Sequence, residues 1–387
     1  MRHPRLAFLI AIVAGTGVMG CAQTSAYADR PATHVAASAG FAYDDFYGEL
    51  APYGTWVSVS YGWAWCPLDV YAGWRPYTVG RWAYTDWGWM WLAEDPWGSI
   101  PYHYGRWAYD DFYGWVWVPG DVWAPAWVSW RYGSGWVGWA PLPPEATWEV
   151  GIGFRYTSGS LDRRIDSNAW CFVPADGFLS RQVRGRVVPP SRNVTLISRT
   201  SNVTRYDEVR RMPAERGLGA EVIARAAGRS VPRYSLVDSD SPRLTKRPAI
   251  RGRRIEVFRP AVDDRVSRDD RLRAEPPERY RSGPPQRLVE RQTAEQRRLQ
   301  AKWREERAQL EREQARERRQ PPRGVSREEL RRRHEEERQA QERREEHMRN
   351  IYRNRQERFG DGRGRERDKD DRQGRADRGR DRGRGRR

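Results

Sequence analysis

The sequence has few of the side chains on which catalysis and metal binding depend. Its 387 residues include 5 His and 3 Cys. Neither Cys66 nor Cys171 has another cysteine or a histidine at the spacing of metal ligands. His103 is the one histidine between residues 41 and 180, and we expect it to be a half-exposed strand residue. We therefore expect no metal and no cofactor, and we expect that the protein is not an enzyme.

Long apolar runs are missing after residue 20. Residues 1–20 combine a positively charged end with an apolar stretch that is too short to span a bilayer, which predicts an export signal. Val18-Met19-Gly20-Cys21 is similar to a bacterial lipobox, so we expect lipidation of Cys21, with ordinary cleavage after Ala28 as the alternative. Residues 21–40 have the composition of a flexible tether. We expect an exported protein, lipid-anchored in the periplasm or outer membrane.

Acidic residues dominate only the first half of the chain. Residues 22–150 contain five Arg and thirteen Asp or Glu, so the net charge of +18 resides in the second half. Such asymmetry is typical of a tail that binds polyanions. Because export separates the protein from most nucleic acid, we expect residues 284–387 to bind other anionic polymers, such as lipopolysaccharide or acidic glycans.

Tryptophan is the residue that the sequence has in excess. Of its 20 Trp, 18 lie between Trp56 and Trp148. They occur in repeated phrases: Gly-Arg-Trp-Ala-Tyr begins at Gly80 and again at Gly105. A second phrase, Gly-Trp-x-Trp, begins at Gly62, Gly88 and Gly114. Self-similarity at a fixed period indicates one supersecondary unit in several copies.

Each copy of the repeat has the pattern of two strands. Trp82 and Tyr84 fall on one face and Arg81 and Ala83 on the other, and aromatic residues at period two predict half-buried strands. Turn residues between the strands predict a β-hairpin. Hairpins of about 26 residues are too short for propeller blades. We therefore expect a mainly β domain over residues 41–180, built as a small barrel or a wrapped antiparallel sheet.

The number of tryptophans suggests a binding surface. Eighteen indoles exceed what a core of this length is expected to hide, so some should be exposed. Indole faces stack on sugar rings, and Trp74, Trp97 and Trp123 lie in the links between hairpins. We expect these three to face a ligand such as polysaccharide or peptidoglycan. The alternative is a structural or assembly protein whose tryptophans form a buried core.

Two further groups have competing interpretations. In an exported protein Cys66 and Cys171 can form a disulfide, and the alternative is two buried thiols that pack as small apolar groups. Asp110 and Asp111 resemble an acid–base pair, but their phrase has the composition of a turn. Turn carboxylates are the simpler interpretation.

The remainder of the chain is charged. Residues 181–283 have the composition of a basic, partly ordered linker, with strand-like residues at 193–204. Arg, Glu and Gln then predict charged helices over residues 284–358, broken near Pro321-Pro322, with too few regular apolar positions to favour a coiled coil. Residues 359–387, rich in Arg and Gly, are expected to be disordered.

The ordered series of phrases resembles a known family. Phe46 to Trp56, both Gly-Arg-Trp-Ala-Tyr phrases, Gly114 to Gly120 and Gly138 to Pro144 are similar to exported bacterial proteins catalogued as domain of unknown function 6600. The resemblance covers roughly residues 41–175. It implies domain limits and export, and it carries no activity and no catalytic residue. We therefore expect a non-catalytic binding or scaffold protein of the cell envelope, with a glycan or a protein as its partner.

Overall fold

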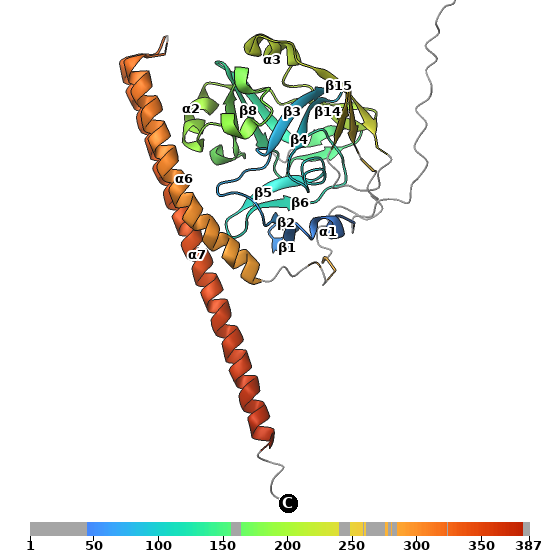
Figure 1. The fold of residues 1–387 in the computed structure, drawn as a ribbon, viewed down its shortest axis with the longest axis vertical. Helices are drawn as coiled ribbons and strands as arrows, with labels where there is room; N and C mark the ends of the chain where they lie inside the picture. Colours follow the sequence, from blue (N-terminus) through green and yellow to red (C-terminus); the bar gives the residue numbers. More distant parts are fainter. Residues whose placement is uncertain are drawn as a thin grey trace, which may run out of the picture. The chain divides into compact units, whose positions relative to one another are not determined.

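The computed structural model describes most of the chain after residue 44 (Figure 1). The described residues are 45–155, 164–239, 248–257, 259–260, 275–277, 280, 285–322 and 324–381. For residues 285–293 and 355–381 the description extends to the backbone alone. The predicted export signal, Cys21, the cleavage site after Ala28 and the tether lie outside the described residues.

Four antiparallel β-hairpins correspond to the copies of the Trp repeat, as the alternation predicted. They follow the short helix α1 (Asp45–Leu50). The hairpins are β1 (Gly54–Val59) with β2 (Gly62–Pro67), β3 (Gly80–Thr85) with β4 (Gly88–Ala93), β5 (Arg106–Asp110) with β6 (Gly114–Val118), and β7 (Val128–Gly133) with β8 (Trp136–Pro141).

The hairpins are distributed over three open sheets. The strand orders are β1-β2-β6-β5, β11-β8-β7-β12 and β16-β17-β15-β3-β4. The added strands are β11 (Cys171–Pro174), β12 (Ser201–Asn202), β15 (Arg233–Asp238), β16 (Ala249–Arg251) and β17 (Arg254–Val257). The mainly β prediction is confirmed. The described strands form no closed barrel, so the wrapped arrangement is the alternative that remains.

Much of the predicted linker belongs to the folded domain. Its strands cover edges that the hairpins leave open: β12 pairs with β7, and β15 pairs in parallel with β3. Smaller pairs are formed by β9 (Thr147–Glu149) with β10 (Gly153–Arg155), and by β13 (Tyr206–Val209) with β14 (Met212–Glu215). Helix α3 (Ala220–Ala227) ends at Gly228, which adopts the left-handed conformation.

The same cross-strand contact recurs in every hairpin: one Trp lies directly opposite another. The four pairs are Trp56 with Trp65, Trp82 with Trp91, Trp107 with Trp117, and Trp130 with Trp139. The rings of Trp82 and Trp91 are 4.9 Å apart with an interplanar angle of 64°. Such an edge-to-face pair contributes about 0.5–1.5 kcal/mol beyond its burial. Trp82 also contacts Trp130 of the β7–β8 hairpin at 4.6 Å, so two sheets meet in one aromatic core.

The expectation that the core could not hide the tryptophans is wrong. Within the tract of 18, all are buried except Trp63, Trp115 and Trp136, which are half-buried. The reason is that later segments supply the cover. Phe178 lies within 4.8–6.2 Å of the rings of Trp82, Trp89, Trp130 and Trp139. The indole of Trp89 donates to the carbonyl of Leu218 over 2.8 Å.

Two long helices follow the β domain. α6 (Pro285–Arg319) and α7 (Arg327–Asp381) match the predicted charged helices and their break near Pro321. The hydroxyl of Ser326 accepts from the amide of Glu329 over 3.0 Å and caps α7. α7 continues past residue 358, where we expected a disordered tail. Of the residues 359–387 assigned to that tail, residues 382–387 lie outside the described part. Propagating a helix costs far less than nucleating one, so α7 continues through residues of poor helix propensity.

A second correction concerns residues 193–204. Asn193–Ser198 forms the helix α2 and not a strand. Its β-branched residues favour a strand, but Leu196 is buried in a cluster with Phe172, and α2 packs on α7. Tertiary packing therefore outweighs local preference.

None of the described helices is long and apolar enough to cross a membrane.

Gly105 and Gly135 allow the energetic cost of backbone strain to be distinguished from the cost of a steric clash. Gly105 (φ +61°) and Gly135 (φ +77°) both adopt the left-handed conformation. A Cβ at Gly105 would lie 2.2 Å from the carbonyl oxygen of Val118, whereas a Cβ at Gly135 would meet nothing within 4 Å. We predict that Gly135→Ala lowers the free energy of unfolding by about 1 kcal/mol through φ strain alone, and Gly105→Ala by about 3 kcal/mol or more. Urea denaturation measures both, and equal losses would contradict the packing argument.

Candidate functional site

The three tryptophans expected to face a ligand are buried. Trp74, Trp97 and Trp123 have exposed fractions of 5%, 3% and 5%. The rings of Trp74 and Trp97 are 5.9 Å apart, and Trp123 stacks on His103 at 5.6 Å. The prediction is wrong because the links between hairpins fold into the core, where their indoles fill the space between sheets. A sugar-binding platform built from these rings is therefore not formed.

The two cysteines are buried and free. Cys66 packs in a small apolar cluster with Val57 and Val116, and Cys171 belongs to the large aromatic core. The disulfide that export allowed is not formed in this structure, and the alternative of two thiols packed as apolar groups describes what is observed. Burial raises the pKa of the Cys171 thiol.

The potential acid–base residues have structural roles. His103 is buried, not half-exposed, because it lies in a turn before β5; burial lowers its pKa to about 4, and its Nδ1 lies 3.0 Å from the carbonyl of Ala124. The carboxylate of Asp110 accepts from the amides of Phe112 and Tyr113, both over 2.8 Å, as the turn interpretation predicted. Among the described residues no group of three or more His, Cys, Asp or Glu could hold a metal ion.

Helices α6 and α7 dock on the β domain through a buried arginine. Arg192 lies in the 3-10 turn Pro190–Arg192, and its side chain is 8% exposed. Its guanidinium contacts Glu313, Glu317 at 3.4 Å and Glu337 at 3.3 Å. Burial opposes the charged form, but the three carboxylates outweigh it and raise the pKa of Arg192. One cation of the β domain thus holds both helices.

The contact between the helices is also polar. Glu317 of α6 accepts from Arg333 of α7 over 2.9 Å and lies 2.8 Å from the Nε2 atom of His334. Arg344 donates to Glu306 over 2.7 Å. These ion pairs place α6 and α7 antiparallel, and they lie beside a buried apolar cluster of Leu299 and Trp303 from α6 with Tyr352 from α7.

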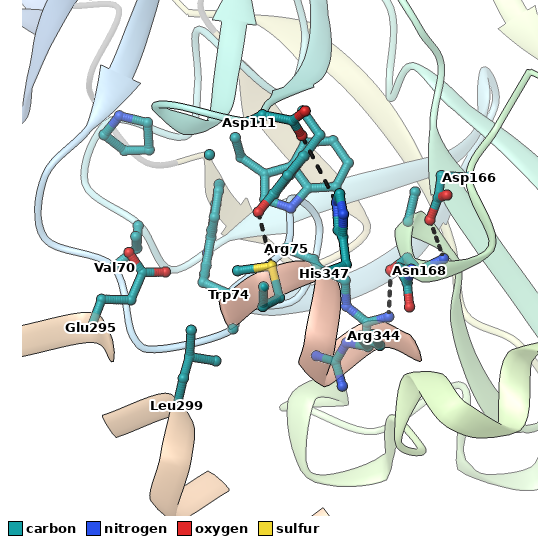
Figure 2. Close-up of a pocket in the computed structure, with 17 residues that line it drawn as sticks. Val70, Trp74, Arg75, Asp111, Asp166, Asn168, Glu295, Leu299, Arg344 and His347 are labelled. Atoms are coloured by element: carbon teal, nitrogen blue, oxygen red, sulfur yellow. Dashed lines mark hydrogen bonds and ion pairs between the residues drawn. The ribbon is translucent and has the colours of Figure 1, made fainter. Parts of the chain in front are cut away.

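A cavity of about 300 Å³ lies where the helical hairpin meets the β domain (Figure 2). Five parts of the chain line it: the link after β2, the β5–β6 turn with its flanking residues, residues 166–169, helix α6 and helix α7. The lining residues labelled in Figure 2 are Val70, Trp74, Arg75, Asp111, Asp166, Asn168, Glu295, Leu299, Arg344 and His347. Aromatic walls with a few polar groups are typical of small-molecule sites.

The polar groups of the cavity bind one another across the interface. The Tyr109 hydroxyl lies 3.3 Å from the sulfur of Met348, and His347 Nε2 lies 3.9 Å from Asp111 Oδ1 (Figure 2). Arg75 donates to the carbonyl of Asn168 over 3.2 Å. We did not predict this site from the sequence, because its walls come from residues more than 200 positions apart.

The docking arginine can be tested directly. Arg192→Gln leaves three partly buried carboxylates without their cation, so we predict a loss of about 3–5 kcal/mol in the free energy of unfolding. Arg181→Gln, at an exposed arginine, should change it by less than about 0.5 kcal/mol. Urea unfolding followed by circular dichroism measures both variants. If the two variants unfold alike, the cluster does not stabilise the docked helices.

Acid should release the same contacts. Burial raises the pKa of Glu317, but its bond to His334 and the charges of Arg192 and Arg333 outweigh it and hold the pKa below the ordinary 4.5. A carboxylate with a lowered pKa stabilises the fold above its unfolded pKa, and this contribution is lost as the pH falls through the folded value. We predict a melting temperature that drops below about pH 4.5, with a smaller drop in Glu317→Gln than in the exposed control Glu311→Gln. Identical drops would contradict this assignment.

Comparisons with known proteins address only the Trp-rich part. One family model matches residues 47–146, which cover the four hairpins and leave out β11, α6 and α7. The part of the cavity lining that comes from residues 166–169, α6 and α7 therefore lies outside the matched segment. No curated protein and no solved structure matches the chain significantly. The predicted resemblance is confirmed: residues 47–146 match the model of DUF6600, a family of unknown function.

Proposed function

We propose that the protein is a non-catalytic scaffold of the cell envelope whose β domain holds a charged helical hairpin that binds anionic polymers. The observation that supports this is the docking of both helices on Arg192. A buried ion cluster fixes the direction in which the helices leave the domain. The β domain then serves as a scaffold that positions the helices, and the helices provide the binding surface.

The buried tryptophans favour this proposal over a sugar-binding aromatic surface. Trp74, Trp97 and Trp123 contribute to the core, so they stabilise the β domain and are not available to a polymer. The exposed large apolar side chains of the β domain are Ile152 at 60%, Val150 at 42%, Tyr109 at 41%, Ile250 at 38% and Tyr61 at 36%, and none of them is a tryptophan.

The length of α7 supports a protruding arm that is rich in arginine. α6 has 35 residues and α7 has 55. Glu317 faces Arg333 and Glu306 faces Arg344, so the last turns of α7 have no residues of α6 opposite them (Figure 1). Residues 359–381 contain seven arginines and one lysine beside seven acidic residues, so the arm is rich in guanidinium groups while its net charge is close to neutral. Guanidinium groups bind phosphates, sulfates and carboxylates, with affinity that falls as salt increases.

Export and anchoring are part of the same proposal. The apolar segment before Cys21 and the lipobox-like phrase support attachment to an envelope membrane. In that location, anionic lipid headgroups, lipopolysaccharide and acidic glycans are the polyanions within reach of the arm.

Heparin provides a polyanion probe for the full-length protein. Seven arginines of α7 are replaced by glutamine in one variant and by lysine in its control: Arg363, Arg365, Arg367, Arg372, Arg375, Arg378 and Arg380. We predict that the glutamine variant binds at least about tenfold more weakly in 50 mM salt and loses most of the salt dependence, whereas the lysine variant keeps both. Binding is followed by fluorescence anisotropy of labelled heparin between 50 and 300 mM salt. Equal binding by the glutamine variant would contradict the proposal.

A further inference from the structure

A second cavity, of about 470 Å³, adjoins the one in Figure 2 and shares Gly73 and Arg75 with it. It lies between the link after β2, residues 184–190 and helix α6. Its lining includes four basic side chains, Arg75, Arg184, Arg298 and Lys302, but only two acidic ones, Glu305 and Glu306. Arg184, Arg298 and Glu305 are exposed at its rim, whereas Arg75 and Lys302 are half-buried and Glu306 is buried.

Two of these cations lie against one aromatic ring. The guanidinium carbon of Arg184 is 3.5 Å from the centre of the Tyr71 ring, and the ammonium of Lys302 is 5.6 Å from it. A cation is attracted to the face of an aromatic ring. Two cations on one ring also repel each other, and an anion between them would remove that repulsion.

Lys302 has acceptors only at long range. Its ammonium is 3.4 Å from the carbonyl of Ala72, 3.5 Å from that of Gly73 and 3.7 Å from Glu306. Ordinary N–H···O bonds measure about 2.7–3.2 Å. Glu306 lies closer to Arg344, at 2.7 Å, so it neutralises two cations at once. Burial is the main cause that lowers the pKa of Lys302 to about 8.

The arginines of the cavity have neutral partners. Arg75 donates to the carbonyls of Asn168 and Trp170. Among the residues that the structure describes, no carboxylate lies within ion-pair distance of Arg75 or Arg184. The cavity thus holds more positive charge than its own carboxylates balance. A site of this kind is complementary to an oxyanion.

We propose that this cavity binds the carboxylate or phosphate group of an acidic sugar, held by Lys302, Arg184 and Arg75 beside the ring of Tyr71. The sugar ring extends into the adjoining cavity of Figure 2. There, Trp115 offers a half-buried aromatic wall and Asp111 a carboxylate that accepts from hydroxyl groups. The site is distinct from the arginine-rich end of α7, so the proposal does not depend on the polyanion binding proposed above.

Sulfate is the first probe, because it remains a dianion throughout the neutral and basic range. Isothermal titration calorimetry with the full-length protein compares Lys302→Met, which keeps the apolar stem, Arg184→Gln, and Arg304→Gln, an exposed arginine of α6 outside the cavity lining. We expect each of the first two variants to weaken sulfate binding by about tenfold, and the control to bind within about twofold of the unmodified protein. Equal affinity in all three variants would overturn the site.

A pH series separates a direct role of Lys302 from a structural one. The groups facing its ammonium are Arg75, Arg184, Arg344, Glu306 and Tyr71; the pKa of Glu306 is lowered and that of Tyr71 is raised, so neither changes charge near pH 8. Sulfate affinity should therefore fall as the pH rises from 7 to 9.5, and in Lys302→Met it should stay flat. A fall of equal size in Lys302→Met would overturn the assignment of this lysine.

The sugar part of the proposal is tested with glucuronate, glucose 6-phosphate and glucose. We expect both charged sugars to bind at least about tenfold more tightly than sulfate, because they add contacts in the adjoining cavity, while glucose shows no measurable binding. The relative affinities of glucuronate and glucose 6-phosphate identify the preferred oxyanion. Sulfate binding without any gain from the sugars would overturn the sugar assignment. In that case polyanion binding by α7 would remain unaffected, since heparin binding is measured on different residues.

Discussion

The tryptophan pair across each hairpin is the contact on which the β domain depends. The hydrogen bonding of its two indoles differs from hairpin to hairpin. On the second strand, Trp65, Trp117 and Trp139 donate to backbone carbonyls, those of Leu50, Tyr104 and Tyr77. On the first strand, the indole nitrogens of Trp56, Trp82 and Trp130 are buried without a partner among the described residues. An unsatisfied buried donor costs about 1–3 kcal/mol, so these rings are retained for their packing, which offsets that cost. In the first and fourth hairpins one Trp thus binds a backbone carbonyl outside the hairpin while the other contributes packing alone. Trp107 and Trp117 of the third hairpin both donate to carbonyls, whereas neither Trp82 nor Trp91 of the second has a partner among the described residues.

The helices are attached by a different kind of force. The aromatic core is apolar and insensitive to salt, whereas Arg192 and its carboxylates form a directional contact between charged groups. Burying charges is costly, and an apolar interface of the same area would hold the helices at least as strongly. What the ion cluster provides is a single geometry, because a guanidinium with three carboxylates fits in one orientation. The shape of both cavities at this junction depends on that docking, since α6 and α7 line the first cavity and α6 lines the second.

Local patterns in the sequence predicted the elements well and the exposure of side chains poorly. The alternation around Trp82 identified strands, and the charged repeats identified α6 and the beginning of α7, although α7 extends beyond the predicted end at residue 358. The burial of Trp74, Trp97 and Trp123 could not be predicted, because it depends on contacts between separate copies of the repeat. Trp74 packs on Trp107, Trp97 packs on Trp65, and Trp123 stacks on His103. The cavity between domain and helices was missed for the same reason. Long-range contacts determine which face of a strand is covered, and period-two alternation contains no information about the covering segment.

The late position of that covering segment has a consequence for biosynthesis. The fourth hairpin is complete at Pro141, whereas Phe178 and Leu218 follow much later in the chain. A chain that emerges from its N-terminus therefore presents the rims of four Trp-rich hairpins to solvent before their cover has been made. Apolar strand edges exposed in this way associate readily with other chains. We therefore expect a chaperone that binds unfolded chains to reduce aggregation of the nascent protein. Its tryptophans are most exposed while residues 142–218 have not yet been synthesised.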